Sequence, residues 1–239
     1  MTKRRITEAK PATASTTQRA VGVMIVDDHE LLRDGLRQLI SRQPYWKVCG
    51  EADSEHQARI RFRELQPDLV IVDLTLRESS GLDLIKWIVD QRPQTRVIVS
   101  TMHDERDYGE RAMKAGASGY VNKHLPATTI LEAIDRVLRG GLFFSEEMTS
   151  RLMHSAVSGA DPRSDPGDPG RSIVGALSNR ELQVFTLIGH GYTTHEIAKK
   201  LHISPNTVGT HRERLKGKLD LNSSADLNRQ ATLWVVQNG

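Results

Sequence analysis

The chain has 239 residues, of which 38% are hydrophobic and 26% are charged, and it contains one cysteine. This composition excludes a disordered chain and an internal disulfide framework, and the net charge of +3 is too small to indicate nucleic-acid binding by itself. No apolar run approaches the roughly 20 residues that cross a bilayer, and the N-terminus lacks a signal peptide, so we expect a cytoplasmic protein with no membrane partner.

The first 20 residues form a basic segment with five Lys or Arg residues and one Glu. Such a segment is typical of a disordered tail. A clamp on DNA phosphates is the alternative interpretation.

From residue 21, short apolar runs alternate with amphipathic ones. The expected strand and helix pairs are 21–26 with 31–40, 46–52 with 55–65, 68–74 with 82–90, 96–101 with 105–115, and 119–122 with 127–138. The alternation predicts a doubly wound α/β domain over residues 21–142, with a five-stranded parallel sheet and functional groups at the carboxyl ends of the strands. Cys49 lies in the second apolar run, which favours a structural thiol.

Three aspartates stand at the ends of predicted strands. Asp27 and Asp28 close the first strand, and Asp73 lies at the end of the third. Carboxylates that cluster in this way are costly without a cation, and oxygen donors with room for water and phosphate suit Mg²⁺. The sequence therefore predicts a divalent cation at this edge of the sheet.

A hydroxyl and an ammonium group converge on the same edge. The fourth strand ends in Ser100 and Thr101, and Lys123 follows the fifth. A carboxylate nucleophile beside Mg²⁺, with a lysine to neutralise the transferred group, is what phosphoryl transfer requires. We expect Asp73 to be the nucleophile.

With these residues in place, the segment 21–140 resembles the receiver domain of bacterial response regulators, which has a flavodoxin-like fold. The matching stretches are VDDHELLRDGL, PDLVIVDL, STMHDE and AGASGYVNK. The resemblance implies the following roles: Asp73 as the phosphoacceptor, Asp28, Asp73 and the Thr75 carbonyl as Mg²⁺ ligands, Asp27 acting on the metal through water, Lys123 as the phosphoryl contact, and Thr101 and Tyr120 as the switch residues.

The segment departs from the receiver pattern at two positions. Arg77 stands where proline is usual, and His124 stands where an acidic residue or proline commonly follows the lysine. We expect His103 and His124 to be surface residues. A phosphatase with an aspartate nucleophile is a rival interpretation, but such enzymes usually carry a second aspartate where this chain has Thr75.

The C-terminal part looks like a separate helical domain. A linker rich in Pro, Gly and Asp is expected over 143–175, and the helical domain over 176–239. Four helix starts are predicted from cap signatures at Ser178 with Glu181, Thr194 near Glu196, Ser204 before Pro205, and Ser223 with Asp226.

The segment 177–239 resembles the LuxR-type helix-turn-helix, and its pairing with a receiver resembles the NarL/FixJ-type response regulators. The resemblance rests on Leu177-Ser178-x-Arg180-Glu181, Gly191, Glu196-Ile197-Ala198, Thr207-Val208, His211 and Lys218-Leu219. It implies an all-α domain of four helices that binds DNA through the helix starting at Ser204. Thr207, Val208, Leu215 and Leu219 are expected in its core.

The expected DNA contacts lie on this recognition helix. They are Asn206, Thr210, His211, Arg214, Lys216 and Lys218. Gly209 and Glu213 stand where the family often has basic residues, so two positive contacts are missing and the resemblance does not identify the operator sequence. The final helix, 225–236, is either a dimer contact, as the family implies, or a core helix of a monomer.

Together these features predict a two-component response regulator that is not an enzyme acting on a separate substrate. We expect a cognate histidine kinase to phosphorylate Asp73, the phosphorylated chain to form a homodimer, and sequence-specific DNA binding then to change transcription. The rival from another class is a DNA-binding protein that acts independently of phosphorylation, with a vestigial receiver.

Overall fold

The computed structural model describes residues 19–76, 79–150 and 176–238. Most of the predicted basic tail, Arg77 and the segment 151–175 of the predicted linker lie outside the described residues. Within the three described ranges, no helix combines the length and apolar content needed to cross a membrane.

The N-terminal domain is built on one parallel sheet, as predicted. Its strands are β1 (Val21–Val26), β2 (Trp46–Ala52), β3 (Leu69–Val72), β6 (Arg96–Thr101) and β7 (Gly119–Asn122). They follow the order β2-β1-β3-β6-β7, which is a doubly wound topology. The order changes direction between β1 and β3, and the predicted acidic residues follow these two strands.

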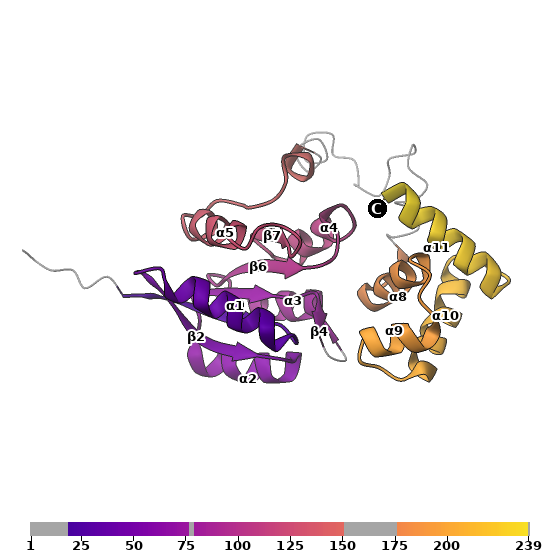
Figure 1. Ribbon diagram of the computed structural model, residues 1–239, viewed down its shortest axis with the longest axis horizontal. Helices are drawn as coiled ribbons and strands as arrows, with labels where there is room; N and C mark the ends of the chain where they lie inside the picture. Colours follow the sequence, from indigo (N-terminus) through magenta and orange to yellow (C-terminus); the bar gives the residue numbers. More distant parts are fainter. Residues whose placement is uncertain (1–18, 77–78, 151–175, 239) are drawn as a thin grey trace, which may run out of the picture.

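Helices cover both faces of this sheet (Figure 1). They are α1 (Glu30–Ser41), α2 (Glu55–Leu65), α3 (Gly81–Gln91), α4 (Glu105–Ala115) and α5 (Thr129–Leu138). Residues of α1 and α5 share one apolar cluster with alternate strand residues such as Ile25 and Ile71. Residues of α2, α3 and α4 share the opposite cluster with Val26 and Val72. Both faces are therefore buried, which is why the strands are apolar throughout.

A short hairpin that the sequence pattern did not predict follows β3. Its strands are β4 (Thr75–Leu76) and β5 (Ser79–Ser80), and it leads directly into α3. A Cβ atom on Gly81 would lie 2.1 Å from the Asp73 carbonyl oxygen, so only glycine lets α3 begin this close to β3. The glycine thus keeps the end of β3 compact around Asp73.

The C-terminal domain consists of α8 (Asn179–Gly189), α9 (Thr194–Lys200), α10 (Pro205–Lys218) and α11 (Ser224–Asn238). Ser178 and Thr193 form capping boxes with Glu181 and Glu196, and Ser204 caps α10. The cap of α9 is therefore Thr193, one residue before the predicted Thr194. The four predicted helices are confirmed.

Helix α11 contributes both to the core and to the surface. It buries Leu227, Ala231 and Trp234, while Leu233 is 55% exposed and Val236 is 75% exposed. Gly189 of α8 lies so close to α11 that a Cβ there would be 2.4 Å from the Ala231 carbonyl oxygen. The helix is part of the monomer core, and an apolar outer face remains available for a dimer contact.

The start of the predicted linker contacts the N-terminal domain. Phe143 forms a parallel bridge with Gly119, and Met148 is buried at 5% exposure beside Gly109 of α4. Residues 143–150 therefore continue the packing of the sheet domain beyond the predicted boundary at residue 142.

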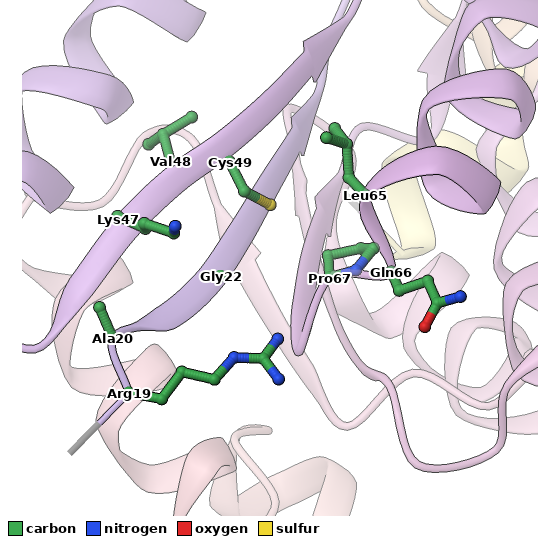
Figure 2. Close-up of a pocket in the computed structure, with 9 residues that line it drawn as sticks. All are labelled: Arg19, Ala20, Gly22, Lys47, Val48, Cys49, Leu65, Gln66 and Pro67. Carbon is green, nitrogen blue, oxygen red and sulfur yellow. The ribbon is translucent and has the colours of Figure 1, made fainter. Parts of the chain in front are cut away.

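Cys49 lines a cavity of about 360 Å³ near the amino ends of β1 and β2, together with Arg19 and Lys47 (Figure 2). Burial raises the pKa of its thiol above the ordinary value, and this effect outweighs the opposing influence of the Cys49 backbone and Lys47. A protonated thiol is a poor nucleophile, which supports the structural role predicted for this residue.

Candidate functional site

The three predicted aspartates meet at the carboxyl end of the sheet. Val26 and Val72 are register partners on β1 and β3, so the residues that follow them are neighbours. Asp27, Asp28, Asp73 and His29 each offer one ligand atom, and these atoms lie within 4.8 Å of one another. His29 was not among the predicted ligands, although it directly follows the aspartate pair.

Lys123 carries the ammonium group of this cluster. Its Nζ lies 2.5 Å from Asp73 Oδ2 and 2.7 Å from Asp27 Oδ2, and its side chain is only 6% exposed. Burial raises the pKa of Asp73, Lys123 opposes that shift, and the nearby Asp27 carboxylate adds to it. One ammonium faces three carboxylates, so a further cation is electrostatically favoured at this site.

The oxygen donors of the cluster fit a magnesium ion. The Asp28 Oδ1 atom is buried and lies 2.8 Å from His29 Nδ1 without a well-aligned hydrogen bond. The backbone N–H of Thr75 donates to Asp73 Oδ1 at 3.1 Å, which fixes the start of the loop that carries the predicted Thr75 carbonyl ligand. Carboxylate and carbonyl oxygens are the ligands that Mg²⁺ prefers.

Thr101 has a buried hydroxyl beside Lys123. The residue is 1% exposed, and among the described residues its hydroxyl has no hydrogen-bond partner. The backbone N–H of Lys123 donates to the Thr101 carbonyl at 2.7 Å, which holds the two residues side by side. A buried hydroxyl without a partner costs roughly 1–3 kcal/mol, and an acceptor arriving at Asp73 would relieve that cost.

Tyr120 points inward. It is 4% exposed, and its hydroxyl donates to the His103 carbonyl at 3.0 Å. His103 itself was predicted at the surface, and it is half-buried in the structure. Its Nε2 lies 3.0 Å from Thr75 Oγ1, its ring centroid lies 4.5 Å from that of Tyr108, and burial lowers its pKa to about 4. His124 is exposed as predicted.

The C-terminal helices form a helix-turn-helix. Helices α9 and α10 are joined by a short turn in which His202 has φ 51°, and the core of the motif includes Val208 and Leu215, as predicted. Thr207 was also expected in the core, but it is exposed and its Oγ1 lies 2.9 Å from the hydroxyl of the cap residue Ser204.

The predicted DNA contacts fall into two groups. Asn206, Thr210 and Arg214 are exposed and lie four residues apart, so they share one face of α10. The other three are His211, Lys216 and Lys218, of which only the last is exposed. His211 is half-buried, Lys216 pairs with Glu213 at 2.9 Å, and Lys218 pairs with Glu181 at 2.6 Å.

Known protein families match the two domains of the chain separately. Residues 23–135 match the response regulator receiver domain, and residues 175–231 match the bacterial regulatory proteins of the luxR family. The chain is 34% identical over 208 residues to the oxygen regulatory protein NreC of Staphylococcus carnosus, covering 86% of this chain and 94% of that protein. It is 32% identical to the transcriptional regulatory protein MctR of Rhizobium johnstonii, with coverage of 90% and 95%.

The chain belongs to the NarL/FixJ-type response regulators. It is a transcription regulator with a receiver and a DNA-binding domain, and not an enzyme. A LuxR-family response regulator from Aurantimonas is 33% identical and has a TM-score of 0.53, covering 58% of this chain and 99% of that one. The Salmonella typhimurium regulator RcsB has the same fold, with a TM-score of 0.60, 24% identity, and coverage of 90% and 98%.

The two domains of this response regulator pack against each other (Figure 1). Arg111 of α4 donates to Asn179 Oδ1 at 3.0 Å and to the Leu177 carbonyl at 2.9 Å. Gln183 of α8 donates to the Leu74 carbonyl at 3.0 Å, and His202 Nε2 lies 3.2 Å from Asp28 Oδ2. The packing therefore brings the DNA-binding domain against the acidic cluster.

Sequence reasoning did not find Gln183, His202 or His103. Gln183 occupies a buried position on a predicted amphipathic helix. A polar residue at such a core position indicates a buried hydrogen bond, and this is the signal by which Gln183 could have been found. His202 stands in a predicted turn, where no local pattern indicates a long-range contact.

Proposed function

We propose that Asp73 accepts a phosphoryl group from a histidine kinase or a small phosphodonor, and that this modification controls DNA binding by α10. The observation that carries the proposal is the Lys123 ammonium, which bridges Asp73 and Asp27 at the bottom of a buried acidic cluster. An Asp73 carboxylate oxygen forms the new bond to phosphorus as the bond to the donor breaks, and Lys123 then faces the added charge.

The cofactor of this reaction is Mg²⁺. Asp28, Asp73 and the Thr75 carbonyl would hold it directly, and Asp27 would act through water. When bound, it would supply positive charge to offset the charge on the phosphoryl oxygens.

The switch residues respond to the new charge. The Thr101 hydroxyl, which has no partner among the described residues, donates a hydrogen bond to a phosphoryl oxygen. Tyr120 then breaks its hydrogen bond to the His103 carbonyl and adopts another side-chain rotamer. Tyr120 shares an apolar cluster with Tyr108 and residues of α8, including Phe185, so its movement changes the surface on which the DNA-binding domain packs.

The DNA interface is the exposed face of α10. Asn206, Thr210 and Arg214 are placed to contact base edges or phosphates. Lys216 and Lys218 contribute after they release Glu213 and Glu181, and His211 contributes from its half-buried position. The phosphorylated chain acts as a homodimer on a two-fold operator, with Leu233 of α11 as part of the dimer contact. We propose the cytoplasm as the location of this activity.

DNA binding should be measured on a randomised duplex pool at fixed salt, with and without Mg²⁺ and acetyl phosphate. We expect the phosphodonor to strengthen selective binding by the wild type and to leave Asp73→Asn unchanged. Equal binding by both proteins under both conditions would mean that the receiver does not control DNA binding, which is the vestigial-receiver alternative. If neither protein binds, the proposed interface on α10 is wrong.

A further inference from the structure

The turn of the helix-turn-helix lies over the metal-binding edge of the receiver. His202 Nε2 is 3.2 Å from Asp28 Oδ2, and the Asp28 side chain is only 3% exposed. The other oxygen, Oδ1, is buried, lies 2.8 Å from the His29 ring, and accepts no hydrogen bond from the described residues. Asp28 therefore contacts the DNA-binding domain through Oδ2, while Oδ1 lies beside the ring of His29, a further candidate ligand of the same site.

The turn that carries His202 is held in place. The guanidinium of Arg180 donates to the Leu201 carbonyl at 2.6 Å, and the Ile203 N–H donates to the Ala198 carbonyl at 3.0 Å. His202 lies between them in the left-handed region, with φ 51°. A non-glycine residue in this region carries a strain of about 1 kcal/mol or more, and the surrounding bonds hold the backbone there.

A second buried contact fixes the DNA-binding domain beside the phosphorylation site. Gln183 is 1% exposed, and its side-chain amide donates to the carbonyl of Leu74, the residue that follows Asp73. Gln183 and His202 thus contact the ends of the two neighbouring strands that supply the acidic cluster, one on the β3 side and one on the β1 side.

We propose that His202 is a positioning residue of the magnesium site, supplied by the DNA-binding domain. It holds Asp28 through Oδ2 so that Oδ1 faces the cluster as a ligand. This inference rests on the proposed function, since it concerns the same metal. Partners that orient a ligand from outside the coordination sphere typically contribute 10–100-fold to metal affinity.

Mg²⁺ binding and the packing of the two domains should be coupled. If the packed arrangement improves metal binding, the metal must favour the packed arrangement by the same factor, because coupling between two binding equilibria is reciprocal. Mg²⁺ alone then stabilises domain packing, and the opening of the protein is left to phosphorylation.

The test is Mg²⁺ affinity of the full unphosphorylated chain, measured by calorimetry for the wild type, His202→Ala, His202→Gln and His195→Ala. Alanine and glutamine share the same backbone strain at this position, and only glutamine retains a side-chain N–H donor. His195 is exposed on α9 and serves as the matched control. We expect about tenfold weaker binding for His202→Ala, with substantial recovery in His202→Gln and no change in His195→Ala.

A double-mutant cycle adds a readout that a purely structural role would not move. Gln183→Ala loosens the packing without touching Asp28, so it should weaken Mg²⁺ binding in the wild-type background and have little further effect in His202→Ala. Equal or tighter Mg²⁺ binding by His202→Ala overturns the positioning role and leaves the proposed function intact. Absence of Mg²⁺ binding by the wild type overturns both.

Discussion

The Nζ atom of Lys123 lies 2.5 Å from Asp73 Oδ2, although 50 residues separate them in the chain. The pair is buried together with Asp27, so Lys123 is the protein's own counterion for this cluster.

We therefore expect Lys123→Ala to destabilise the receiver at neutral pH by about 3–5 kcal/mol, because it leaves buried carboxylates uncompensated. Mg²⁺ should restore most of this loss, since it supplies the missing positive charge. Urea unfolding with and without Mg²⁺ measures both effects. Lys114→Ala, which removes an exposed pair with Glu110, is the control and should change stability by less than about 1 kcal/mol. An equal loss with and without Mg²⁺ would argue against a metal site here.

Two glycines of the DNA-binding domain should respond oppositely to the same substitution. Gly189→Ala places a Cβ atom 2.4 Å from the Ala231 carbonyl oxygen and 2.4 Å from Val235 Cγ2, whereas a Cβ atom on Gly209 would meet nothing within 4 Å. We expect Gly189→Ala to lower stability by about 1–3 kcal/mol through overpacking. Gly209→Ala should raise it by up to about 1 kcal/mol through helix propensity. Thermal unfolding of both variants checks this, and a loss at Gly209 would mean that α10 is constrained by something other than its own helix.

Asp107 should make the stability of the folded protein dependent on pH. It lines a cavity of about 260 Å³ between the domains, with His190 and Trp234 on the opposite side. Burial, and then the nearby Asp104, raises the pKa of Asp107 from 3.8 to about 7, with Arg106 opposing. Because the folded protein binds this proton more tightly than the unfolded chain does, its contribution to stability falls as pH rises from about 4 to about 7.

The variant Asp107→Asn isolates this contribution. Histidines 103, 124 and 190 also line the cavity and are common to both proteins, so the difference between wild type and variant belongs to Asp107. We expect the stability of the variant to decline less between pH 4 and pH 7. Parallel pH profiles for the two proteins in denaturant titrations would contradict this assignment.

Arg111 should help to hold the two domains together. Its guanidinium donates to Asn179 and to the Leu177 carbonyl, and hydrogen bonds of this charged kind contribute about 1.5–3 kcal/mol. Arg111→Ala should therefore increase the radius of gyration measured by small-angle scattering and reduce the dependence of DNA binding on phosphodonor. Arg106→Ala removes an exposed side chain of the same helix and is the control. An unchanged radius in Arg111→Ala would show that other contacts hold the domains together.

The sequence by itself determined the parts of this response regulator that depend on local patterns. Strand and helix periodicity predicted the doubly wound sheet, and it placed Asp27, Asp28, Asp73, Thr101 and Lys123 at one edge because parallel strands end on the same side. Cap signatures located the four C-terminal helices to within a residue, since a capping box is formed by residues only three apart.

Only the tertiary structure decided the relations between distant segments. His103 reads as a surface residue in the sequence, and burial against Thr75 and Tyr108 makes it part of the site. Gln183 bonds to Leu74 across 109 residues, and His202 reaches Asp28 from a turn of the other domain. These contacts depend on how two separately folded domains dock, and the local periodicity and capping that reveal the elements of each domain carry no information about that docking.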